Sequence, residues 1–144
     1  MKIGLIGDHI TDIYVFGEMK RFSPESPIPI FDIKSSEERA GGASNVNNNL
    51  LKLGAETEYF YDGKEFCVKK RFVCDNHIMF RCDEDKISNY NVTWAQISEE
   101  VQYVILSDYN KGVLRDSQKL IHRLKSQGKT VVRSEEHTSE LQSH

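Results

Sequence analysis

The sequence predicts a doubly wound α/β fold whose parallel sheet carries a small β-lid inserted early in the chain. Short apolar runs typical of buried parallel strands occur at Lys2–Gly7, Val101–Leu106 and Lys129–Val132. The amphipathic stretch Leu114–Lys125 separates the last two runs, and this strand–helix–strand order implies a right-handed crossover. Stretches of alternating polarity within residues 13–83 supply the lid.

The first third of the chain predicts two lid strands and one helix. Ile13–Glu18 and Ile28–Lys34 alternate in polarity and contain β-branched and aromatic residues, as half-buried strands do. Three prolines hold the connection between them extended. Ser44–Leu53 has apolar residues at helical spacing, and we expect Ser44 to cap this helix and Gly54 to stop it.

The middle of the chain predicts a hairpin that completes the lid. Phe66–Val73 and Ile78–Cys82 flank the turn pair Asp75-Asn76. The two parts of the lid therefore cover about residues 13–36 and 66–83.

Composition bounds the possible partners and the compartment. The formal net charge is −3, from 19 basic and 22 acidic residues, so no basic excess points to nucleic acid. No apolar run approaches the ~20 residues that span a bilayer, and the N-terminus enters a strand without the features of a signal peptide. The three cysteines form no Cys-x-x-Cys pair, which disfavours a disulfide framework or a zinc site. We therefore expect a cytoplasmic protein with reduced thiols, no metal site in this chain, and no nucleic-acid or membrane partner.

Polar residues follow the predicted strands at the edge where open α/β sheets bind ligands. We expect Asp12, Gly42, Asn45 and Asp108 to surround one crevice. The Asp12 carboxylate can accept hydrogen bonds from two vicinal sugar hydroxyls, and the Asn45 amide offers both a donor and an acceptor. Gly41 and Gly42 let the backbone approach a ligand closely. The alternative is a turn-forming aspartate beside an ordinary loop.

Four cations fall on the predicted lid, namely Arg21, Lys69, Arg71 and Arg81. Arginine suits bidentate contact with phosphate, so a substrate that already carries a phosphate would find partners there. A solvated strand face is the alternative for any one of them. We expect at least one of the four to bind substrate phosphate.

Three segments together resemble the PfkB/ribokinase family of sugar kinases. They are Arg21–Pro29, with the pattern Arg-x-Ser-Pro-Glu-x-Pro-x-Pro, the Gly-Gly-Ala-Ser-Asn-Val stretch Gly41–Val46, and the Asp-Tyr-x-Lys-Gly stretch within Ser107–Gly112. The resemblance runs from Met1 to about Val132. The first pattern is typical of the heptose 7-phosphate kinases that make ADP-heptose precursors, and it separates them from ribokinases, fructokinases and adenosine kinases.

The resemblance implies a ribokinase-like fold and transfer of phosphate from ATP, with Mg²⁺, to the anomeric hydroxyl of a heptose 7-phosphate. It implies that Asp108 and Lys111 lie beside the transferred phosphoryl group, and that a full-length protein forms a homodimer through its lid. The implied substrate-binding residues are Asp12, Arg21, Gly41, Gly42, Asn45, Arg71 and Arg81. Two alternatives stay open: a kinase of another sugar or sugar phosphate, and a sugar-binding or assembly module without catalysis.

The chain departs from the family pattern in two places. Only Ala55–Cys67 connects the helix to the hairpin, where family members usually have a further strand–helix unit. The family's Gly-Ala-Gly-Asp motif, which carries the catalytic base, and its adenine-binding part have no match here. We expect the base beyond Val132, no catalytic residue within this chain, and no activity from the chain itself.

The last twelve residues do not continue the pattern of the fold. Thr130-Val-Val132 begins a buried strand, and polarity then rises abruptly. Arg133–His144 resembles the translation of a common sequencing adapter, so we interpret it as a non-native tail after a kinase part at residues 1–132. A polar native tail is the alternative.

Overall fold

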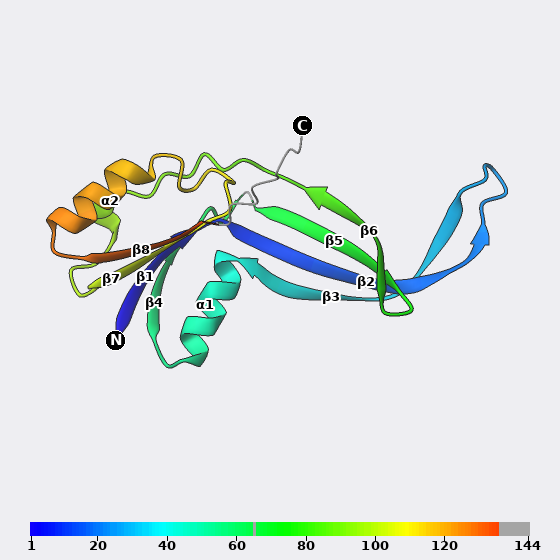
Figure 1. Cartoon of the computed structure of the whole chain (residues 1–144), viewed down its shortest axis with the longest axis horizontal. Helices are drawn as coiled ribbons and strands as arrows, with labels where there is room; N and C mark the ends of the chain where they lie inside the picture. Colours follow the sequence, from blue (N-terminus) through cyan, green and yellow to red (C-terminus); the bar gives the residue numbers. More distant parts are fainter. Residues whose placement is uncertain (65, 136–144) are drawn as a thin grey trace, which may run out of the picture.

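The computed structural model describes residues 1–64 and 66–135, which form two four-stranded sheets joined to one another (Figure 1). The first, which we call the core sheet, is entirely parallel and has the strand order β4-β1-β7-β8. Its strands are β1 (Lys2–Gly7), β4 (Glu56–Phe60), β7 (Tyr103–Asp108) and β8 (Thr130–Glu135). The predicted parallel sheet is therefore present.

Helices lie on both faces of the core sheet. α1 (Ala43–Lys52) lies on one face, while α2 (Ser117–Ser126) and the short 3₁₀-helix η1 (Trp94–Gln96) lie on the other (Figure 1). The main apolar cluster lies on the α2 side and includes the fully buried Leu106 and Leu124. A parallel sheet needs this cover because its strands are apolar on both faces.

The second sheet is the predicted lid, with the strand order β3-β2-β5-β6. Its strands are β2 (His9–Phe22), β3 (Pro29–Gly42), β5 (Cys67–Cys74) and β6 (His77–Glu84). β2 and β3 are each 14 residues long, so their far ends extend beyond the shorter β5–β6 hairpin (Figure 1). Asp75 and Asn76 have φ values of 47° and 63°, as the two central residues of a tight hairpin turn require. The predicted hairpin is confirmed.

Sequence analysis predicted strands around the lid that are too short, and it missed one strand. β2 begins directly after β1, and β3 continues through the two glycines, which end a strand rather than form a loop. β4 was not predicted, because Glu56–Phe60 is short and begins with polar residues. As the edge of the core sheet it is only half-buried, so its sequence carries little of the apolar signal of β1.

The predicted cap of the first helix is wrong. Gly42 occupies the N-cap position of α1, and no side chain caps the helix there. The Ser44 hydroxyl instead donates a hydrogen bond to the carbonyl of Gly41, at 2.6 Å. The reason is that β3 turns directly into the helix at Gly42, which places Ser44 inside the first turn. Gly54, with φ 81°, follows the end of α1 and confirms the predicted stop.

β8 extends into the segment that we interpreted as a non-native tail. Arg133, Ser134 and Glu135 continue its pairing with β7. Pairing along a sheet edge uses backbone groups, which any sequence supplies except at proline. Residues 136–144 lie outside the described part of the chain, so the interpretation of this segment stays a prediction.

Asp8 is a buried carboxylate at the junction between the two sheets. It is 1% exposed and follows β1 directly. Its side chain accepts backbone N–H hydrogen bonds from Tyr109 at 2.9 Å, Lys111 at 3.2 Å and Val113 at 3.2 Å. The loop after β7 is therefore wrapped around a charge that β1 supplies.

Replacing Asp8 with alanine should destabilise the chain strongly. Three backbone N–H groups would lose their acceptor in a site that excludes water, so the free energy of unfolding should fall by about 3 kcal/mol. Urea denaturation followed by circular dichroism measures this loss. Glu25→Ala, which removes an exposed carboxylate in the turn between β2 and β3, is the control and should change little. Equal effects of the two substitutions would contradict this role of Asp8.

A second carboxylate joins the amino-terminal ends of the core strands. Glu58 on β4 pairs with the Lys2 ammonium at 2.8 Å and accepts the Ser98 backbone N–H at 3.0 Å. Burial opposes ionisation of Glu58, but the hydrogen bonds from Lys2 and Ser98 outweigh it and lower its pKa from 4.5 to about 2. The ionised form is therefore favoured by folding.

This shift gives the stability of the chain a predictable acid dependence. Because the pKa of Glu58 is lower in the folded state, its contribution is present above pH 4.5 and is lost as the pH falls towards 2. Glu58→Gln should remove about 1–2 kcal/mol of this dependence, a value reduced for solvent screening. Urea denaturation between pH 5 and 2 measures it. Glu56→Gln on the same strand is the exposed control, and a wild-type acid profile in Glu58→Gln would refute the assignment.

Candidate functional site

Two glycines bring the lid and α1 together at the edge of the core sheet. Gly42 has φ 55°, a left-handed conformation that strains residues with a side chain. A Cβ atom on Gly41 would collide with the carboxylate of Asp12 on the neighbouring strand. Gly42 therefore needs glycine, whereas Gly41 is buried and the Asp12 carboxylate fills the space beside its backbone.

Asp12 forms an ion pair with Arg71 across the β2–β5 strand pair. Their side chains are 22% and 19% exposed, so the pair is partly shielded from water. The hydrogen bond to Asp12 raises the pKa of Arg71, which keeps the guanidinium charged. The Arg71 and Arg39 guanidinium carbons lie 5.3 Å and 4.4 Å from the centre of the Tyr14 ring. These contacts hold two cations beside the carboxylate.

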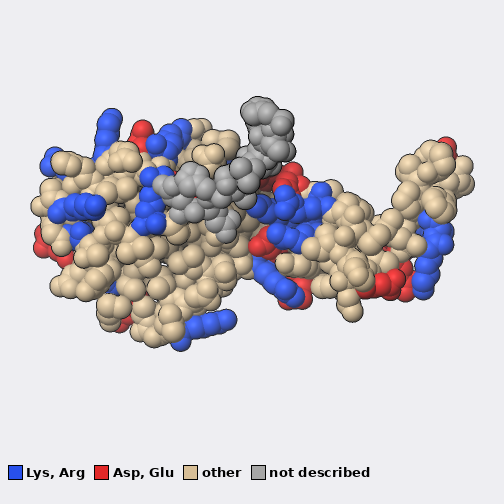
Figure 2. All heavy atoms as spheres, in the orientation of Figure 1, with Lys and Arg blue, Asp and Glu red and all other residues tan. Residues whose placement is uncertain are grey.

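Four cations share one face of the lid, which we call the cationic lid face; they are Arg39, Lys69, Arg71 and Arg81. Arg39 and Lys69 are the cross-strand partners of Asp12, and Arg81 is the partner of Arg71. Since cross-strand partners point to the same side of a sheet, all four lie on the face of Asp12, with Arg81 one strand further away than the others. Figure 2 shows basic side chains gathered on the part of the lid next to the core. Arg81 also hydrogen-bonds Asp83 at 2.9 Å.

Asn45 is exposed in the first turn of α1, immediately after the two glycines. Its side chain makes no hydrogen bond to the described residues 1–64 and 66–135, so the side-chain amide is available to a ligand. A cavity of about 390 Å³ adjoins the start of this helix. It is lined by His9, Thr11, Glu38, Arg39, Ala40, Ser44, Asn47, Asn48, Tyr59 and Tyr61.

Sequence analysis missed an aromatic cluster that lines this cavity. His9 stacks on Tyr61 with ring centres 4.7 Å apart, and its Nδ1 lies 3.2 Å from the Tyr59 hydroxyl. Burial lowers the pKa of His9 and raises that of Tyr59, so both side chains are neutral at pH 7. The cluster could not be predicted because it depends on β4, whose end carries Tyr59.

Asp108 and Lys111 lie at the carboxyl end of β7, as predicted. Asp108 accepts the Asn110 backbone N–H at 2.9 Å and pairs with Arg133 at 2.8 Å. The Lys111 ammonium pairs with Asp85, just past the end of β6, at 2.9 Å, and this contact lowers the pKa of Asp85. Both charges are therefore already compensated in this structure.

Asp108 also belongs to a cavity of about 260 Å³ at the start of α2. It is lined by Asp108, Asn110, Gly112, Leu114, Arg115, Ser117, Gln118 and Arg133. Because β1 and β7 are neighbours, this cavity and the Gly41-Gly42 turn lie at the same edge of the core sheet.

One predicted site residue, Arg21, lies far from the other predicted substrate-binding residues. It lies nine residues beyond Asp12 on β2, a distance of about 30 Å along a strand. There it pairs with Asp32, at 2.8 Å and 3.1 Å. The reason is that β2 continues outward instead of ending near the core, so within one chain Arg21 stands apart from the cationic lid face.

Two further features of the described residues bear on ligands. Among residues 1–64 and 66–135, no group of three or more His, Cys, Asp or Glu side chains is arranged to hold a metal ion. Neither α1 nor α2 combines the length and apolar character that crossing a bilayer demands.

Comparison with known proteins connects the chain to carbohydrate kinases, although no family model matches it. The bifunctional protein HldE of Helicobacter acinonychis is 33% identical over 149 residues, covering 78% of this chain and 32% of that protein. The chain thus spans about a third of the curated relatives it matches. Because that 149-residue stretch exceeds the whole chain in length, the relative has residues without a counterpart here, which agrees with the shortened connection after α1.

Solved structures show the same fold. A carbohydrate kinase from Agrobacterium tumefaciens matches with a TM-score of 0.53 and 13% identity, over 92% of this chain and 52% of that one. Phosphofructokinase-2 from Escherichia coli, in complex with fructose-6-phosphate, matches with a TM-score of 0.52 and 9% identity, over 93% and 55%. The predicted ribokinase-like fold is confirmed.

Proposed function

We propose that this chain, which belongs to the PfkB/ribokinase family of sugar kinases, is the sugar-binding part of an enzyme that phosphorylates a heptose 7-phosphate on its anomeric hydroxyl. The observation that carries this proposal is the placement of Asp12 among the four cations of the cationic lid face. A carboxylate suits sugar hydroxyls, and neighbouring arginines suit a phosphate. One face therefore offers partners for both ends of a phosphorylated sugar.

The roles of the residues follow from these positions. Asp12 accepts hydrogen bonds from vicinal hydroxyls, and Asn45 adds a donor and an acceptor from α1. Gly41 has no side chain, so the Asp12 carboxylate can lie close to the backbone there, and Gly42, with φ 55°, leads the chain into α1. Arg71 orients the Asp12 carboxylate through their ion pair, and Arg81 is exposed enough to reach the substrate phosphate.

Phosphoryl transfer also needs groups that this chain does not present. ATP would supply the phosphoryl group and Mg²⁺ would neutralise its charge; the described residues form no cluster that would hold this ion. We place the nucleotide site and the general base in the part of the family fold that this chain does not match. Lys111 would neutralise charge near the transferred group after leaving Asp85. The chain alone is then inactive.

The three cysteines in the described part of the chain are free thiols, which suits the reducing cytoplasm, where we place the enzyme.

Kinetics of the polypeptide extended to the full length of the family would test the site. In a coupled ADP-release assay with heptose 7-phosphate, Asn45→Ala should lower kcat/KM about tenfold, because one polar contact to the sugar is lost. Asn49→Ala, one turn further along α1 and equally exposed, is the matched control. The 144-residue chain should release no sugar-dependent ADP.

A second matched pair of variants tests which lid arginine binds the substrate phosphate. Arg81 and Arg21 are both exposed arginines paired with an aspartate, but only Arg81 lies on the cationic lid face. Arg81→Ala should raise the KM for the phosphorylated sugar about tenfold, and Arg21→Ala should leave it unchanged. Equal changes in the two variants, or turnover by the unextended chain, would refute this placement of the site.

We also propose that the lid of the extended enzyme pairs with a second copy. The face opposite the cationic lid face carries stacked Phe72 and Phe80, 4.3 Å apart, with Phe31 packed edge-on against them. Phe80 is 42% exposed, so apolar surface is open to solvent there. A two-fold contact between lids would bury it.

Light scattering of the extended protein tests the pairing of lids. Wild type should be a dimer at micromolar concentration and Phe80→Glu a monomer, because a charge would be buried at the contact. Ile87→Glu is the control, since Ile87 is exposed outside the lid strands. A wild-type monomer would exclude the contact.

A further inference from the structure

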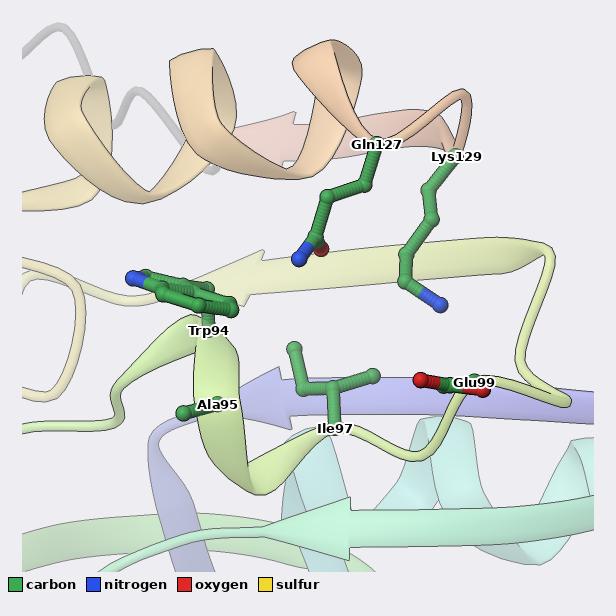
Figure 3. Close-up of a pocket in the computed structure, with 6 residues that line it drawn as sticks. All are labelled: Trp94, Ala95, Ile97, Glu99, Gln127 and Lys129. Carbon is green, nitrogen blue, oxygen red and sulfur yellow. The ribbon is translucent and has the colours of Figure 1, made fainter.

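A cavity of about 470 Å³ lies far from the sugar site. It is lined by Trp94, Ala95, Ile97, Glu99, Gln127 and Lys129 (Figure 3). Glu99 precedes β7 and Lys129 precedes β8, so the cavity lies at the amino-terminal ends of the core strands. The Gly41-Gly42 turn and Asp108 lie at the opposite, carboxyl ends. Its volume is in the range of small-molecule sites.

The walls of this cavity are held in place by hydrogen bonds. The Lys129 ammonium donates to the backbone carbonyls of Ser98, at 3.0 Å, and Val101, at 2.5 Å. Ile97 is 6% exposed and belongs to the main apolar cluster. A capping box between Thr93 and Gln96 fixes the turn that carries Trp94. The cavity is therefore built on rigid parts of the core.

Two polar groups in the cavity are left for a ligand. The Gln127 side chain reaches from the end of α2 towards Ile97, between Trp94 on one side and Glu99 and Lys129 on the other (Figure 3). Within residues 1–64 and 66–135, neither the side-chain amide of Gln127 nor the carboxylate of Glu99 makes a hydrogen bond. A primary amide next to an aromatic ring presents a donor and an acceptor to the edge of a stacked heterocycle.

The aromatic and charged groups narrow the class of ligand. Trp94 is 40% exposed, and the Arg123 guanidinium carbon lies 5.4 Å from its ring centre. The part of the indole that Arg123 does not cover can stack on a planar heterocycle. A carboxylate such as Glu99 accepts hydrogen bonds from ribose hydroxyls. Lys129 stays charged, but two of its three N–H groups already donate to carbonyls, which leaves a single donor for a phosphate.

We propose that this cavity binds a purine nucleoside, with the base stacked on Trp94, its donor–acceptor edge on Gln127 and the ribose hydroxyls on Glu99. Gln side chains recognise adenine through such paired hydrogen bonds, so adenosine is the probe. The site is separate from the kinase nucleotide pocket, which we place outside this chain. It therefore does not depend on the proposed kinase function.

Tryptophan fluorescence of the 144-residue chain gives a direct test, because Trp94 is its single tryptophan. Titration with adenosine, excited where adenosine does not absorb, should quench the emission saturably with a Kd below about 1 mM. Gln127→Leu should weaken binding about tenfold. Gln118→Leu, the same change at the other end of α2, is the matched control and should bind as wild type does. Circular dichroism confirms that both variants keep the wild-type fold.

Further probes separate this site from the alternatives. Glu99→Gln should weaken adenosine and leave adenine, which lacks the ribose, unchanged; calorimetry with Trp94→Phe should show weaker binding of both. The proposal is overturned by absence of saturable quenching, by equal loss in Gln127→Leu and Gln118→Leu, or by AMP binding tenfold tighter than adenosine. Loss of adenosine binding in Asn45→Ala would also overturn it, because the ligand would then occupy the sugar site.

Discussion

The buried carboxylate of Asp8 is the constraint on which the arrangement of the site depends. Its oxygens hold the loop after β7 through three backbone N–H groups. Its own backbone joins the same region, because its N–H donates to Ser107 at 3.2 Å and its carbonyl accepts from Ala43 at 2.9 Å. One residue thereby connects the end of β1, the loop of Lys111 and the start of α1. The Gly41-Gly42 turn and that loop are placed relative to each other by this contact.

Around that junction, the cations of the site are held by neighbouring carboxylates. Arg71 pairs with Asp12, Arg81 with Asp83 and Lys111 with Asp85. These ion pairs orient the cations, so under the proposed function an anionic substrate would meet them already in place. Because Lys111 pairs with a residue just past β6, its release from Asp85 would then link substrate binding to the position of the lid.

Local signals in the sequence were sufficient where backbone geometry is decided by neighbouring residues. Asp75 and Asn76 accept positive φ, so the hairpin could be located, and Gly54 marked the end of α1. Asp12 and Gly41 were both expected at the sugar site, and the structure places them near each other on the adjacent strands β2 and β3. The cap at Ser44 failed because the exact start of a helix depends on how the preceding strand enters it.

By itself, the sequence determined the layers of the fold, the place of the two glycines before the first helix and the types of charge near them, because apolar periodicity and special backbone conformations are properties of short segments. Only the tertiary structure decided which cations stand beside Asp12 and which stand apart, as Arg71 and Arg21 do. It also decided that His9 packs on Tyr59 and Tyr61, and that Trp94 and Gln127 share a cavity. Strand length, register and the pairing of distant segments determine these neighbours, and such long-range contacts leave no periodic signal in the chain.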